Sequence, residues 1–166
     1  MLRRRNGTGF PGRKRPGGAP PPDARDSALK LLSRREHSAR ELKRKLIDRG
    51  VEESDADSAI EQLSDRGLQS DDRFAEQLIR TRIAQGYGPM RIEAELKQAG
   101  LSGDQITVAI DAADCDWTEQ AARAQEKRFG RVPTSMAERT RQYRFLMGRG
   151  FESEQIRRVL KGDLQD

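Results

Sequence analysis

Apolar and polar residues along this chain follow the spacing of short amphipathic helices, and no segment shows the alternating pattern of a strand. The pattern recurs every 50 residues around three glycines, Gly50, Gly100 and Gly150. Each glycine follows a helical stretch and precedes an apolar residue, as expected for a glycine that ends a helix in the left-handed conformation. Most positions four and eight residues before each glycine are Leu or Ile, and Gln142 is the exception: Leu42, Leu46, Ile92, Leu96 and Leu146. An apolar pair also lies nine and ten residues after each glycine: Ala59-Ile60, Ala109-Ile110 and Val159-Leu160.

Repetition at this period indicates tandem modules, and we place them at residues 23–69, 70–114 and 115–166, each with three short helices. In the first module we expect helices over roughly 26–36 and 39–49 and a third that ends before Gly67. Side chains that can cap helix starts support the second and third of these: Ser38 with Glu41, and Ser54 with Asp57.

The second and third modules carry similar helix-start signals. In the second module we expect a helix over 72–85, one that begins at Pro89, and one opened by Ser102 with Gln105. In the third, Asp116 and Glu119 cap a helix that runs to Phe129. Later helices start at Thr134 or Ser135 and at Ser153.

The apolar stripe of each helix is narrow. Hydrophobic residues make up 34% of the 166-residue chain and charged residues 36%, which is enough for a small core in each module but not for one large core. We therefore predict an all-α protein, a tandem array of three three-helix modules that is elongated and curved.

After residue 22 the chain has a net charge of −1, so the net charge of +5 comes from the first 22 residues, which carry +6. This segment is rich in Gly and Pro and cannot fold alone. We expect a disordered tail. Its bases could contact phosphates or a partner, or the tail could be a solvated extension. The candidate phosphate contacts are Arg3, Arg4, Arg5, Arg13, Lys14 and Arg15.

The first module has opposite charges in its two halves, with eight bases and three acids from Lys30 to Arg49 and eight acids with one base over 50–72. Arg40, Lys43 and Arg44 share one helix face, opposite Leu42 and Leu46, so we expect them to face solvent. The cluster could bind phosphates or an acidic protein, or it could be a solvated face offset by nearby carboxylates. With bases of the third module, the contact candidates are Arg34, Arg35, Arg40, Lys43, Arg44, Lys45, Arg49, Lys127, Arg128, Arg131, Arg141, Arg144, Arg149, Arg157 and Arg158.

Residues for catalysis, cofactor binding or metal binding are scarce. A single cysteine, Cys115, and a single histidine, His37, cannot form a disulfide or a Cys/His zinc site. Asp71 and Asp72 directly precede a helix, where capping is the simplest role for carboxylates. Phe74, Phe129, Phe145 and Phe151 occupy positions typical of core residues, leaving no repeated stacking platform for bases. We therefore expect no catalytic, cofactor or metal site and no enzymatic activity.

The chain also lacks a run of about 18 apolar residues, and its basic start is not followed by an apolar segment, so we predict a cytoplasmic protein without membrane contact.

Several strings, in their order and spacing, resemble the RecX regulatory family, the modulators of RecA recombinase. The resemblance covers about 26–162 and rests on residues 35–42 (REHSAREL), 70–75 (SDDRFA), 86–89 (GYGP) with Ile92, Glu95 and Leu96, 144–146 (RFL) and 149–151 (RGF). Two features depart from the family: Ser70, where an aromatic residue or Leu is common, and the basic tail.

The resemblance implies a non-enzymatic protein that lodges in the helical groove of the RecA–DNA filament and suppresses ATP hydrolysis and strand exchange. It implies the filament as main partner, with single- and double-stranded DNA bound only weakly, and we expect a monomer. The alternative is a sequence-tolerant DNA-binding protein, or a transcription factor that uses helix pairs as helix-turn-helix units. Against it, the helix over 39–49 offers only long basic side chains, which suit phosphates better than base edges.

Overall fold

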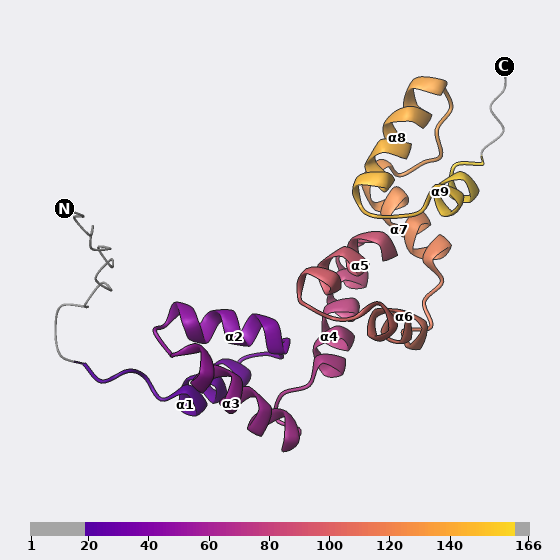
Figure 1. Ribbon diagram of the computed structural model, residues 1–166. Coiled ribbons are helices and arrows are strands. Elements are labelled where there is room, and N and C mark those ends of the chain that lie inside the picture. Colours follow the sequence, from indigo (N-terminus) through magenta and orange to yellow (C-terminus); the bar gives the residue numbers. More distant parts are fainter. Residues whose placement is uncertain (1–18, 162–166) are drawn as a thin grey trace, which may run out of the picture.

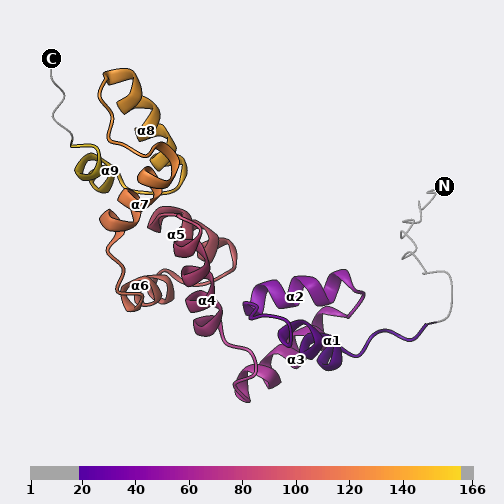
Figure 2. The same cartoon turned by 180° about the vertical axis from the view of Figure 1, so that it is seen from behind.

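The computed structural model of this protein describes residues 19–161, and in this range it contains nine helices and no strands. Their bounds group them in threes: α1 (Ala24–Leu32), α2 (Ala39–Asp48) and α3 (Glu53–Asp65) in module 1; α4 (Asp71–Ala84), α5 (Pro89–Gln98) and α6 (Gly103–Ala112) in module 2; α7 (Trp117–Phe129), α8 (Met136–Gly148) and α9 (Ser153–Val159) in module 3. The modules follow one another along an elongated, bent array, as Figures 1 and 2 show from opposite sides. The predicted fold class is confirmed.

Most helix starts carry the caps that the sequence predicts. The hydroxyl of Ser38 accepts a hydrogen bond from the Glu41 backbone, and Ser102 and Gln105 form a reciprocal capping box. Pro89 takes the first turn of α5.

Two predictions at helix ends are wrong. α3 begins at Glu53 after Glu52, two residues earlier than a Ser54 cap would allow, and no side chain caps it. α1 begins at Ala24, where Asp23 caps it, and ends at Leu32 instead of near residue 36. Residues 33–38 instead connect α1 to α2, and the His37 carbonyl in this segment accepts a hydrogen bond from Gln69 at the end of module 1.

The three repeated glycines end α2, α5 and α8 with φ angles of 93°, 94° and 90°. In each case the following residue donates a backbone hydrogen bond across the helix end, for example Val51 N to Leu46 O at 3.1 Å. Val51, Leu101 and Phe151 are all buried. The prediction of left-handed glycines followed by an inward-packing apolar residue is confirmed.

Each module has its own small apolar core. Leu42 and Leu46 in module 1, Ile92 and Leu96 in module 2, and Leu146 in module 3 are fully buried at equivalent positions of the repeat. Gln142, the exception, is buried as well. Its side chain accepts a hydrogen bond from Gln125 Nε2 at 2.9 Å and donates to the Arg131 carbonyl at 3.2 Å.

Candidate partner and nucleic-acid interface

α2 carries the predicted basic face of module 1. The cap at Ser38 fixes where the helix begins, and Leu42 and Leu46 turn inward to the core. Because Arg40, Lys43 and Arg44 stand on the other side of this short helix, they lie toward the surface.

Intramolecular ion pairs neutralise part of this face. Lys43 Nζ lies 2.8 Å from Glu53 and 2.9 Å from Asp57, both on α3. Hydrogen bonds from Lys43 to Glu53 and Asp57 raise its pKa above the ordinary value. These pairs favour the alternative for Lys43, in which nearby carboxylates offset the basic face, because α3 crosses α2 with its acidic side toward this lysine.

Arg35 is also engaged within module 1. Its guanidinium makes two hydrogen bonds to the Glu41 carboxylate, at 2.6 and 3.2 Å. Partial burial disfavours the Glu41 carboxylate, but the hydrogen bond and charge of Arg35 outweigh it, so the pKa of Glu41 is lowered.

The other predicted cations of module 1 make no ion pair with any residue between 19 and 161: Arg34, Arg40, Arg44, Lys45 and Arg49. Arg40 is exposed at its head, but its stem packs on a glycine of module 2. A Cβ at Gly100 would lie 2.7 Å from Arg40 Cδ. Arg44 is the cation of the predicted stripe that is both exposed and uncommitted.

A cleft of about 760 Å³ separates α2 from α4 and α5. Its apolar floor includes Phe74 and Leu78. Bases of module 1 line this cleft together with Arg82 and Arg91 of module 2. The sequence did not indicate these two arginines as candidates, because module 2 is acidic overall. Both of these arginines are paired with Glu95, at 2.8 and 3.1 Å.

The predicted cations of module 3 also include some that form ion pairs and some that do not. Arg131 pairs with Glu138, and Arg157 and Arg158 pair with Glu154. Four others have no ion pair within the described part of the chain: Lys127, Arg128, Arg141 and Arg144. The guanidinium groups of Arg128 and Arg141 lie 5.6 and 5.7 Å from the ring centre of Phe129, where cation–π attraction holds them near the surface of α7.

The junction between modules 1 and 2 is built from polar contacts. Ser38 Oγ donates to the Ala99 carbonyl at 2.8 Å, and Asp71 accepts from the Ala39 backbone at 2.8 Å and from Gln69 Nε2 at 2.9 Å. Asp71 was predicted to cap the helix, but Ser70 caps α4 and Asp71 lies in its first turn. It also ties the start of α4 to the start of α2.

The junction between modules 2 and 3 uses the equivalent positions 50 residues later. Gly88 stands at the position of Ser38, and Arg149 at that of Ala99. Gly88 N donates to Arg149 O at 2.8 Å, and Met90 N donates to Gly150 O at 2.9 Å. Arg149 reaches back to the Gln85 carbonyl and lies 4.7 Å from the Tyr87 ring centre. This predicted contact residue therefore serves the junction itself.

Between residues 19 and 161 no group of three His, Cys, Asp or Glu side chains could hold a metal ion. No helix in that range is long and apolar enough to cross a membrane.

Phe74 and Phe151 are buried as predicted, while Phe129 and Phe145 are half-buried and meet edge to face at 5.3 Å. The six tail bases, Arg3 to Arg15, lie outside the described residues.

Comparisons with known proteins match each module separately. Family models described as the first, second and third three-helix domains of RecX match residues 24–63, 70–110 and 114–160. The Regulatory protein RecX of Xanthomonas axonopodis pv. citri is 45% identical over 140 residues, which are 84% of this chain and 86% of that protein. The protein of the same name from Halorhodospira halophila is 43% identical over 141 residues, covering 84% and 88%.

Solved structures show the same fold. The crystal structure of RecX from Lactobacillus salivarius superposes with a TM-score of 0.71 at 22% identity, covering 83% of this chain and 92% of that one. A second structure, described as a crystal structure of regulatory protein RecX, gives 0.68 at 22% identity, covering 83% and 70%. The similarity thus extends over all three modules.

Proposed function

The chain belongs to the RecX family of regulatory proteins, and from this premise we propose that it is a negative regulator of RecA recombinase. It binds in the groove of the RecA–DNA filament and inhibits ATP hydrolysis and strand exchange. In this proposal the protein acts as a monomer, carries no catalytic site and binds bare DNA only weakly.

The observation that supports this proposal most is the position of the uncommitted cations. They lie on module 1 and on module 3, at the two ends of a bent array. The intramolecular ion pairs of the described residues involve other cations, so these remain available to a partner. A filament offers acidic protein surfaces and DNA phosphates at repeated intervals. Contacts of modest strength at both ends of one chain gain from effective concentration.

The direct test is DNA-stimulated ATP hydrolysis by the cognate recombinase. The protein is titrated from far below to equal molarity on filaments assembled on single-stranded DNA, and binding to bare DNA is measured in the same salt. We expect inhibition well below equimolar, at concentrations that leave bare DNA unbound. Inhibition that only tracks coating of the DNA would favour the DNA-binding alternative, because phosphate contacts alone would then explain it.

The structure offers a matched pair of variants on α2 for the same assay. Arg44→Gln removes an uncommitted cation, whereas Lys43→Gln removes one already paired with Glu53 and Asp57. We expect Arg44→Gln to raise the half-inhibitory concentration about fivefold to tenfold, as for loss of one charged contact, and Lys43→Gln to change it much less. An unchanged half-inhibitory concentration for Arg44→Gln would show that module 1 does not bind through this face.

A further inference from the structure

α6 has an unusual composition for this chain. Half of its ten residues are apolar, yet Ile106 is its only buried residue. Residues 98–122 contain no Lys or Arg, although the whole chain has 32, and they hold five carboxylates: Asp104, Asp111, Asp114, Asp116 and Glu119. An apolar, acidic helix face therefore lies open between the two modules that carry the uncommitted cations.

The 50-residue repeat shows that this exposure is particular to module 2. Val108 is 68% exposed, while the equivalent positions in the other modules hold the polar residues Ser58 and Arg158. Ile110 is only half-buried, whereas the equivalent Ile60 and Leu160 are buried. The structure thus leaves apolar groups uncovered on α6 where modules 1 and 3 present polar ones or bury the apolar ones.

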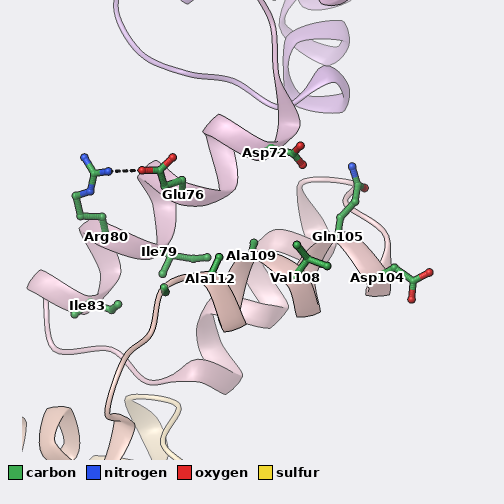
Figure 3. A pocket seen from close by; sticks show the side chains of 11 residues that line it. Asp72, Glu76, Ile79, Arg80, Ile83, Asp104, Gln105, Val108, Ala109 and Ala112 are labelled. Atoms are coloured by element: carbon green, nitrogen blue, oxygen red, sulfur yellow. Dashed lines mark hydrogen bonds and ion pairs between the residues drawn. The ribbon is translucent and has the colours of Figure 1, made fainter.

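A groove of about 710 Å³ lies between α6 and α4 beside these residues. Ile79 and Ile83 line it from α4, and Val108, Ala109 and Ala112 line it from α6 (Figure 3). α4 and α6 pack less closely than α1 with α3 or α7 with α9. The small side chains of the alanines in its lining leave room for another backbone to approach closely.

Carboxylates surround this apolar floor. Asp72, Glu76 and Asp104 line the groove, and its one base, Arg80, pairs with Glu76 at 2.6 Å. Asp72 and Asp104 are exposed and have no ion pair with any residue from 19 to 161. The groove therefore combines apolar contact with unpaired negative charge.

We propose that the α4/α6 groove is a docking surface for a basic amphipathic helix of the recombinase. Such a helix would place its apolar side on Ile83, Val108 and Ala112 and its bases next to Asp72 and Asp104, the helix-in-groove mode of recognition. The inference rests on the proposed function for the identity of the partner, and it assigns to module 2 a protein contact that the basic faces of modules 1 and 3 do not provide.

Matched substitutions test the groove in the filament assay. Val108→Glu adds a like charge to the groove and removes its most exposed apolar group, and we expect it to raise the half-inhibitory concentration about tenfold. Leu68→Glu makes a similar change at a 45% exposed leucine between α3 and α4, which lines neither the groove nor the proposed basic contacts, and should leave inhibition unchanged. Circular dichroism of both variants checks that the helices are retained. An unchanged half-inhibitory concentration for Val108→Glu would overturn the inference.

A photo-crosslink identifies the occupant directly. Benzoylphenylalanine replaces Val108 in the full-length chain, the filament is added, and the crosslinked peptides are sequenced by mass spectrometry. A crosslink to a basic helical segment of the recombinase supports the inference. A crosslink to residues 1–18 of this chain or to a second copy of it, or no crosslink at all, overturns it.

These two experiments separate the inference from the proposed function. If the wild-type protein does not inhibit ATP hydrolysis but position 108 crosslinks to a basic recombinase helix, the proposed inhibition fails and the docking surface stands. If the wild-type protein inhibits and Val108→Glu inhibits equally well, the docking surface fails and the proposed function stands.

Discussion

Gln142 shows how a single residue can interrupt the repeat without weakening the fold. It stands where modules 1 and 2 bury Leu42 and Ile92, and its amide shares hydrogen bonds with Gln125 and the Arg131 carbonyl. We expect Gln142→Leu to lower the free energy of unfolding by about 1–3 kcal/mol, because the buried Gln125 amide loses a partner. The double variant Gln125→Leu with Gln142→Leu should be less destabilised than the sum of the two single variants in urea unfolding. Simple additivity would show that the two amides act independently.

We expect His37 to make the stability of the protein sensitive to pH. Burial, then the charge of Arg35, lower its pKa below the ordinary value of 6.5, and Glu41 offsets this only in part. His37 Nδ1 lies 3.2 Å from the nearer oxygen of Glu41 but does not meet the geometry of a hydrogen bond.

The sign of the effect follows from proton uptake. Below about pH 6.5 the unfolded chain binds a proton at His37 that the folded chain resists, so the free energy of unfolding falls as the pH decreases. The lowered pKa of Glu41 acts in a separate window below its ordinary value of 4.5. We expect wild-type protein to lose stability in urea between pH 7.5 and 5.5, and His37→Gln to lose less over the same interval. Parallel losses in both proteins would assign the effect to another group.

At the scale of single side chains, the sequence predicted which cations exist but not which remain available. Local spacing placed Arg40, Lys43 and Arg44 together on one face. The ion pairs of Lys43 depend on how α3 crosses α2, and the stem of Arg40 lies on Gly100 of the next module. These contacts join residues distant in sequence, about which helix periodicity carries no information.

At the scale of the elements, helix starts and ends were largely predictable because caps are local. Ser38, Ser102 and Asp116 act as the sequence indicates, and the glycine at each repeat end adopts a left-handed conformation. Gly100 and Gly150 also pack against the preceding module, and this second role could not be predicted from the sequence. At these two positions the 50-residue repeat therefore marks both a helix end and a junction between modules.

The junction role of Gly150 can be separated from its backbone conformation. Alanine at a φ of +90° is strained by about 1–2 kcal/mol, and its Cβ would also lie 2.5 Å from Arg91 Cβ. Gly67→Ala is the matched control, since its φ is +68° and no atom lies within 4 Å of the added Cβ. We expect Gly150→Ala to lower the free energy of unfolding more than Gly67→Ala does and to change the solution scattering profile. Indistinguishable profiles and equal losses of stability would mean that the junction absorbs the added methyl group.

At the scale of the whole molecule, hydrogen bonds cross both junctions between modules, and the uncommitted cations lie toward the two ends of the array. Arg44 on α2 and Arg144 on α8 are both exposed and lie in different terminal modules. If one protein molecule contacts the filament through both ends at once, each residue contributes to the same binding event. Two distant, independent contacts then contribute additively to the binding free energy.

This reasoning gives a quantitative expectation for the double variant. If Arg44→Gln and Arg144→Gln each raise the half-inhibitory concentration about fivefold to tenfold, together they should raise it by the product, roughly 25-fold to 100-fold. Lys43→Gln combined with Arg144→Gln serves as control and should not exceed the effect of Arg144→Gln by much, because Lys43 is already paired with α3. A double variant no weaker than Arg44→Gln alone would show that module 3 stays off the filament. The bent array would then act through modules 1 and 2 only.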